Sequence, residues 1–167
     1  MAEITKVYKE HFPALRFIGK RFSNGGEAWG EWFAKNLAKP LDKLAKDNGI
    51  GKDFICGLDW TGLMIGQPNV EYWAGVFFPA GTDVPEGYDF MDLEAGDVGL
   101  CWIKGKDTED DNIYDCQKCR KAIEANGMTE FRKNSSGNNI YFHVYGPRFA
   151  KPDEDGNKTL DYGFYLA

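Results

Sequence analysis

Hydrophobic and polar residues alternate over several short runs of the chain, a pattern typical of β-strands. Glu71–Phe78 (EYWAGVFF), which Pro79-Ala80-Gly81 ends, is the clearest of these runs. A loop rich in Gly, Pro and Asn is predicted after Trp60. Together the alternating runs and the short apolar runs between turn residues predict strands at 14–22, 53–60, 71–78, 89–93, 97–104, 140–145 and 160–166.

Two other segments repeat their hydrophobic residues at helical spacing. Residues 27–46 form the longer one, and Pro40 within it predicts a kink or two helical pieces. Residues 110–126 predict a short amphipathic helix, which Asn126-Gly127 closes.

The order of these elements predicts an α+β fold in which one β-α-β-β unit is used twice. The halves would cover about 14–93 and 95–167 of a single domain, 1–167. The simplest packing for this order is a mostly antiparallel sheet with two helices on one face. The other face would then be free to hold a ligand pocket.

Side-chain alternation sorts each strand into a helix side and an open side. In 140–145 the purely apolar set (Ile140, Phe142, Val144) predicts the side under the helices. In 71–78 the set that contains Tyr72 is predicted to lie under the helices. The opposite set there combines an acid, an indole and Gly75, which leaves space for a ligand.

The open-side sets are rich in aromatic rings with polar tips. Phe, Tyr and Trp make up 15% of the chain, and a pocket walled by such rings suits an organic ligand. If the ligand is a cation, the ring faces attract it. The alternative is that the rings simply cover a sheet face. The residues predicted to bind the ligand are Trp60, Glu71, Trp73, Trp102, Tyr141, His143, Tyr145 and Tyr165.

Composition narrows the classes of partner. The net charge of −6 and the scattered Lys and Arg argue against direct nucleic-acid binding. No apolar run is long enough to span a membrane, and no signal peptide is recognised, so a cytoplasmic protein with four free thiols is predicted. Cys116-Gln-Lys-Cys119 lacks the second ligand pair of a zinc site. We therefore predict neither a metal nor a cofactor.

Catalytic motifs are sparse. Ser135-Ser136 and the two His residues make no nucleophile–base arrangement. Glu71, His143 and Tyr145 are the candidates if the protein is an enzyme that uses general acid–base chemistry. No catalytic residue is assigned, and binding is favoured over catalysis.

Several segments resemble the GyrI-like effector-binding domains. They are Glu71–Val76 through Pro85, Leu93–Gly99 to Gly105, Tyr141–Tyr145 and Gly163–Ala167, so the resemblance covers nearly the whole chain. Such domains form the ligand-binding part of AraC- and MerR-type transcription regulators and also occur alone. The resemblance implies a duplicated β-α-β-β fold with a pocket between its halves.

The chain departs from this family in two ways. No segment fits a helix-turn-helix, so a stand-alone module without a DNA-binding domain is expected. Multidrug-binding relatives carry a pocket Glu in the strand that matches Tyr141–Tyr145, where this chain has His143. A neutral His cannot supply the negative charge, and Glu71 is the remaining candidate.

The predicted function is binding of a hydrophobic or amphipathic small molecule, cationic or neutral, by a sensor, carrier or sequestering protein. Two alternatives follow from the resemblance. The first is a small hydrolase that acts on a strained or reactive xenobiotic. The second is a module that docks a protein partner, as gyrase inhibitors do. The sequence leaves the ligand, the protein partner and the oligomeric state open.

Overall fold

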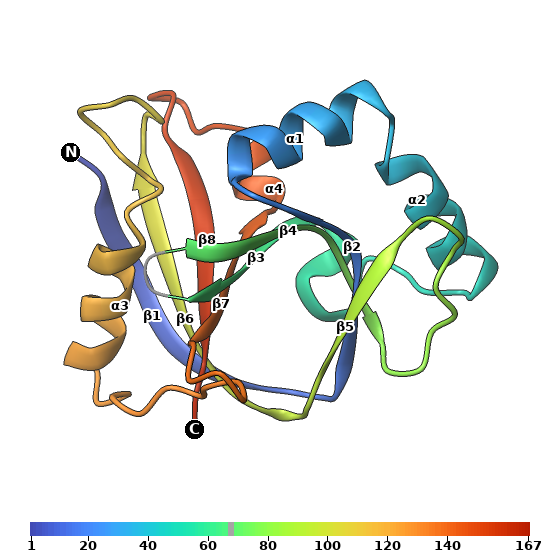
Figure 1. The fold of residues 1–167 in the computed structure, drawn as a ribbon. Helices are drawn as coiled ribbons and strands as arrows, with labels where there is room; N and C mark the ends of the chain where they lie inside the picture. Colours follow the sequence, from blue (N-terminus) through green and yellow to red (C-terminus); the bar gives the residue numbers. More distant parts are fainter. Residues whose placement is uncertain (67–68) are drawn as a thin grey trace. The chain divides into compact units, whose positions relative to one another are not determined.

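The computed structural model of the chain describes residues 1–66 and 69–167 (Figure 1). These residues fall into two compact units: unit 1 comprises Met1–His11 and Asp97–Ala167, and unit 2 comprises Phe12–Gly96. Antiparallel strand pairs build the sheet of each unit, and helices lie between the strands along the chain. The predicted α+β class is confirmed. Whether the chain behaves as a single domain stays a prediction.

Unit 2 contains four strands in the order β3-β4-β2-β5. Its helices come between β2 and β3 along the chain. The elements are β2 (Leu15–Phe22), α1 (Gly25–Ala34), α2 (Ala38–Asp47), the short 3₁₀ helix η1 (Ile55–Leu58), β3 (Trp60–Gly66), β4 (Asn69–Pro79) and β5 (Asp89–Leu93).

Unit 1 contains four strands in the order β1-β6-β8-β7. Its elements are β1 (Glu3–Phe12), β6 (Gly96–Gly105), α3 (Cys116–Ala125), β7 (Ile140–Tyr145), the one-turn helix α4 (Pro147–Ala150) and β8 (Lys158–Tyr165). Each unit thus has the predicted β-α-β-β order plus one further strand. The added strand is β5, which pairs with β2 in unit 2, and β1, which neighbours β6 in unit 1.

The long helical segment divides near Pro40, as predicted. Helix α1 ends at Ala34 and α2 begins at Ala38, so Pro40 lies in the first turn of α2, where its missing N–H costs no hydrogen bond. Strand β1 was not predicted, because most of its side chains are exposed and the strand therefore lacks a strong apolar pattern.

The strand predicted at 53–60 is wrong. Cys56 and Leu58 have φ of 58°, in the left-handed region that a strand does not use, and the segment forms η1. The loop predicted after Trp60 is also wrong up to Gly66, because these residues form β3. Residues 67 and 68 of that predicted loop lie outside the described part of the chain.

Helix α3 begins later than predicted, at Cys116 instead of Asp110. Asp115 caps the helix by accepting a hydrogen bond from the backbone N–H of Lys118 at 3.0 Å. The polar side chains before it bond to the local backbone, as Asp111 Oδ2 does when it accepts from the N–H of Lys106. Such bonds compete with helix formation.

In unit 2 the predicted sides of β4 are correct. Tyr72 lies under α1, where its hydroxyl accepts a hydrogen bond from Trp29 Nε1 at 2.8 Å. Trp73 lies on the opposite face, with its ring edge-to-face against Phe17. All residues from Tyr72 to Phe78 are buried, so both faces of this central strand are covered.

In unit 1 the predicted sides of β7 are reversed. Cys101, Tyr162 and His143 lie side by side on neighbouring strands, and the Cys101 thiol hydrogen-bonds to that of Cys119 on α3. His143 is therefore on the face that α3 covers, and Phe142 is on the other. The sequence separates the two sides of a strand, but both sides of β7 are buried, so hydrophobicity does not tell which one meets a helix.

The space that Gly75 was predicted to leave for a ligand is filled. A Cβ placed on Gly75 would lie 2.8 Å from the Phe17 ring, and one on Gly163 in unit 1 would lie 2.2 Å from the Phe142 ring. In both units a phenyl ring from a neighbouring strand packs over a glycine in the middle of the sheet. These glycines create room for the core and not for a ligand.

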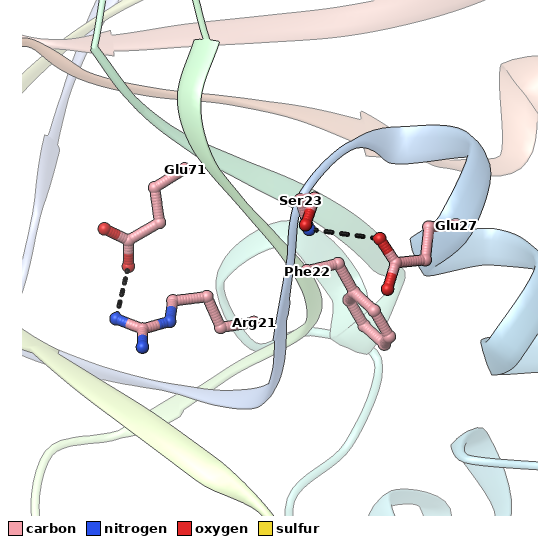
Figure 2. Close-up of a pocket in the computed structure, with 5 residues that line it drawn as sticks. All are labelled: Arg21, Phe22, Ser23, Glu27 and Glu71. Atoms are coloured by element: carbon pink, nitrogen blue, oxygen red, sulfur yellow. Dashed lines mark hydrogen bonds and ion pairs between the residues drawn. The ribbon is translucent and has the colours of Figure 1, made fainter.

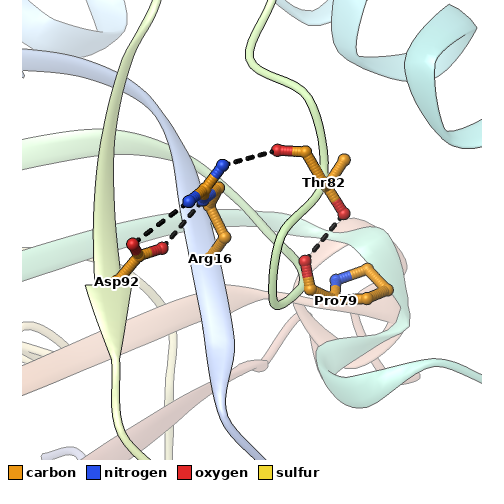
Figure 3. A network of polar contacts seen from close by, with 4 residues as sticks. All are labelled: Arg16, Pro79, Thr82 and Asp92. Atoms are coloured by element: carbon orange, nitrogen blue, oxygen red, sulfur yellow. Dashed lines mark hydrogen bonds and ion pairs between the residues drawn. The ribbon is translucent and has the colours of Figure 1, made fainter.

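A polar network connects the edge strand of unit 2 to its neighbour (Figure 3). Arg16 donates from Nε and Nη2 to the two carboxylate oxygens of Asp92 on β5, and from Nη1 to the carbonyl of Thr82. The Arg16 hydrogen bonds lower the pKa of the Asp92 carboxyl. One guanidinium thus ties β2 to β5 and to the loop that precedes β5.

Candidate functional site

A pocket of about 360 Å³ lies at the end of the unit 2 sheet, where β2 passes into α1 (Figure 2). The last two residues of β2, the first turn of α1 and the beginning of β4 contribute to it. The described residues that line it are Arg21, Phe22, Ser23, Glu27 and Glu71.

The turn that builds one wall follows from helix capping. Asn24 is the N-cap of α1, and its side chain accepts a hydrogen bond from the backbone N–H of Glu27 at 2.9 Å. The Glu27 carboxylate in turn accepts from the backbone N–H of Ser23 at 3.4 Å. This reciprocal arrangement resembles a capping box and holds Glu27 at the pocket wall.

Glu71 is held by its neighbours on the sheet. Its Oε1 accepts a hydrogen bond from Trp73 Nε1 at 2.5 Å, and Arg21 Nη1 lies 3.7 Å from the same oxygen. The Arg21 side chain is 64% exposed, so this ion pair is weak. The indole fixes the carboxylate, and the guanidinium neutralises it only in part.

The lining charges leave the pocket acidic. Two carboxylates, Glu27 and Glu71, and one guanidinium, Arg21, give the described lining a formal charge of −1. Phe22 is the aromatic residue of this lining. Such a pocket favours a ligand that combines positive charge with apolar area.

The predicted binding residues of unit 2 divide between this pocket and the core. Glu71 lines the pocket, and Trp73 lies directly behind it, 6% exposed. Trp60 instead packs under α1, where its ring contacts the rings of Trp32 and Phe33. It forms part of the interface between α1 and the sheet.

His143 and Tyr141 of unit 1 lie in the core. His143 is 5% exposed and Tyr141 is fully buried. Burial lowers the pKa of His143 to about 3, so the imidazole is neutral at physiological pH. Its Nδ1 lies 3.4 Å from the Tyr162 hydroxyl, and its ring also contacts Tyr145 edge-to-face.

Trp102 and Tyr165 lie on the face of unit 1 that α3 does not cover. Tyr165 is buried and packs edge-to-face against Phe142. Trp102 is partly exposed and stacks against Arg148. A ligand-binding role for these residues stays a prediction.

Sequence reasoning did not identify four of the pocket residues: Arg21, Phe22, Ser23 and Glu27. One signal was present, since Asn24 followed three residues later by Glu27 is a helix-start pattern. That pattern places a carboxylate next to the end of β2. The proximity of Glu27 to Glu71, which follows it by 44 residues in the chain, required the pairing of β2 with β4.

Among residues 1–66 and 69–167, no three His, Cys, Asp or Glu side chains come together as metal ligands would. No helix in this part of the chain has the length and hydropathy needed to cross a membrane.

The comparisons with known proteins identify related folds. No protein-family model matches the chain, and no curated protein matches it in sequence. A candidate transcription regulation protein from Staphylococcus aureus MU50 is 12% identical, with a TM-score of 0.57 over 96% of this chain and 97% of that one. The protein SAV2435 bound to tetraphenylphosphonium is also 12% identical, with a TM-score of 0.56 over 98% and 94%.

A hydrolase from Listeria innocua is 7% identical, with a TM-score of 0.54 over 97% of this chain and 92% of that one. At these identities the comparisons establish a shared fold. The function has to be argued from the residues of this chain.

Proposed function

We propose that the protein binds an amphipathic organic cation in the pocket at the end of β2, with Glu71 as the counter-charge. It would act as a cytoplasmic effector-binding module of the GyrI-like type. The observation that carries this proposal is the acidic pocket itself, in which a fixed carboxylate is only weakly paired with Arg21. The fold shared with the tetraphenylphosphonium-bound protein adds support.

The geometry favours a cation for a physical reason. Trp73 donates its N–H to Glu71, which holds the carboxylate oxygen in place before a ligand arrives. Preorganisation of this kind reduces the entropy lost on binding. The exposed Arg21 side chain can move away from Glu71 at little cost, since the ion pair is long and solvated.

The test is calorimetric titration with tetraphenylphosphonium and with triphenylphosphine oxide, a neutral compound with similar rings. We expect the cation to bind more tightly, and Glu71→Gln to weaken it about tenfold while the neutral compound is unaffected. The Gln oxygen still accepts from Trp73, so only the charge is lost. Glu31→Gln is the matched control, because Glu31 pairs with Lys35 on the exposed side of α1.

Equal binding of both compounds, or an unchanged affinity in Glu71→Gln, would contradict the proposal. The recovered ligand is then analysed by mass spectrometry. Hydrolysis of an ester or a strained-ring analogue by the wild type would instead favour the enzymatic alternative.

A further inference from the structure

A second acidic and aromatic site lies in unit 1, and a residue of the same chain occupies it. The Arg148 guanidinium carbon lies 3.7 Å from the centroid of the Trp102 ring. Arg148 Nη2 also donates to Asp161 Oδ2 at 2.5 Å. The Arg148 guanidinium thus stacks on an aromatic ring and donates a hydrogen bond to a carboxylate. Proteins bind guanidinium groups through these two contacts.

The acceptor half of this site is rigid. Trp102 on β6 and Asp161 on β8 are direct partners in the antiparallel register, so the backbone fixes the ring and the carboxylate side by side. Tyr8 on β1 packs edge-to-face on Trp102, with ring centroids 6.3 Å apart. The Asp161 side chain is only 20% exposed, so its charge is less screened than that of a surface carboxylate.

The cation comes from a smaller element. Arg148 lies on α4, a single turn of four residues that has no side-chain cap at its N-terminus. Its own side chain is 42% exposed. Backbone hydrogen bonds and the packing of Phe149 against Tyr145 hold α4, whereas paired strands hold the acceptor. Displacement of the Arg148 side chain therefore disturbs less structure than displacement of Trp102 or Asp161.

We propose that Trp102 and Asp161 form a binding site for amidinium and guanidinium compounds, for which Arg148 is an internal competitor. A ligand of this class stacks its planar cation on Trp102 and donates N–H groups to Asp161. Tetra-substituted cations have no N–H to donate, so they match this site less well than the pocket of unit 2.

Lys6 is another charged group at this site. Its ammonium lies 4.6 Å from the Trp102 ring centroid and 4.5 Å from that of Tyr8. Removal of Arg148 therefore leaves the Lys6 ammonium over the Trp102 ring. Coulomb attraction alone gives little affinity for an added cation, and binding depends on the stacked geometry and the hydrogen bonds to Asp161.

The experiment titrates benzamidine, a planar amidinium, into wild type, Arg148→Ala and Arg148→Gln by calorimetry. With internal competition, the apparent affinity equals the intrinsic affinity multiplied by the fraction of molecules in which Arg148 has left the site. We expect both variants to bind benzamidine at least about tenfold more tightly than wild type. Adding Asp161→Asn or Trp102→Leu to Arg148→Ala should abolish the gain.

Arg120→Ala is the matched control. Arg120 also lies over a ring, Phe131, and pairs with a carboxylate, Glu124, but these acceptors are not paired on neighbouring strands. This variant should not gain affinity.

Equal affinity of wild type and both Arg148 variants would overturn the proposal, as would retention of the gain in the Trp102→Leu double variant. The same comparison is repeated in a Glu71→Gln background, where the unit 2 pocket has lost its counter-charge, so a gain from Arg148→Ala that persists there is independent of the proposed function. Circular dichroism and thermal unfolding verify that each variant is folded.

Discussion

In unit 2, Glu71 is fixed by Trp73, and the nearest guanidinium lies 3.7 Å away on the exposed Arg21. In unit 1, Asp161 is paired at 2.5 Å with Arg148, which also covers the neighbouring Trp102. Both units thus place a carboxylate beside an indole on an antiparallel sheet. The difference lies in the cation, which is loosely held in unit 2 and stacked in unit 1.

This comparison indicates how the same sheet topology can present either an accessible or an occupied site. A carboxylate whose partner is exposed and distant keeps most of its charge for a ligand. A carboxylate whose partner is stacked on an aromatic ring has already gained the hydrogen bonds and the cation–π attraction that a ligand would offer. Composition alone does not distinguish the two.

Substitution of the two central glycines, Gly75 and Gly163, should have the largest effects on the free energy of unfolding. Gly75→Ala is expected to cost at least about 3 kcal/mol, because the new Cβ would lie 2.3 Å from the carbonyl oxygen of Ile18, and backbone cannot rotate away. Gly163→Ala should cost about 1–3 kcal/mol, since its Cβ meets the Phe142 ring, which can tilt. Urea unfolding monitored by circular dichroism measures both.

Gly30→Ala on α1 is the control for this pair. No atom lies within 4 Å of a Cβ at that position, so the variant should be neutral or more stable by about 0.5–1 kcal/mol. A larger loss in Gly163→Ala than in Gly75→Ala would contradict the distinction between ring and backbone contacts.

Buried His143 should make stability fall in acid. Its folded-state pKa of about 3 lies below the ordinary value of 6.5, so the unfolded chain takes up a proton that the folded chain refuses. Stability is therefore lost as the pH falls from about 6.5 toward 3, by about 2 kcal/mol between pH 7 and pH 5. Unfolding curves at several pH values give this slope.

His143→Gln should reduce that loss between pH 7 and pH 5. His11→Gln is the matched control, because His11 is an exposed residue of β1 and His143 is intact in this variant. A pH profile that is the same in His143→Gln and wild type would show that His143 is not the group responsible.

The two carboxylates should differ in their effect on stability, although less strongly than the residues above. Asp161→Asn weakens a short ion pair and leaves Arg148 with a neutral partner, so a loss of about 1 kcal/mol is expected. Glu71→Gln keeps the acceptor for Trp73 and loses only a long pair, so a change within about 0.5 kcal/mol is expected. Thermal unfolding at low and high salt compares them, and equal losses would remove the distinction between the units.

Prediction from the sequence was most successful where one local pattern decides the structure. The strand at Glu71–Phe78 and the division near Pro40 both depend on residues that are neighbours in the chain. It failed at 53–60, where apolar residues adopt left-handed backbone conformations that hydrophobicity does not report. It also failed for β1, whose exposed side chains give no apolar signal.

For the candidate site, the sequence identified Glu71 but not the residues around it. Arg21 lies on β2 and Glu71 on β4, and α1, α2, η1 and β3 separate these two strands along the chain. The proximity of the two side chains therefore depends on the β2–β4 register. Trp60 is partly buried against the rings of α1, and Tyr141 and His143 are buried in the core of unit 1. A ligand-binding role for these three residues stays a prediction.

By itself, the sequence determined the α+β class and the two sets of side chains on opposite sides of β4 and β7, because these follow from the periodicity of neighbouring residues. Only the tertiary structure decided which side of β7 meets α3, which ring fills the space above Gly75, and which cation lies beside each carboxylate. Those outcomes depend on the register between strands distant in sequence and on competition for the same volume. The local pattern of residues along the chain indicates neither the register between distant strands nor which side chain fills a given volume.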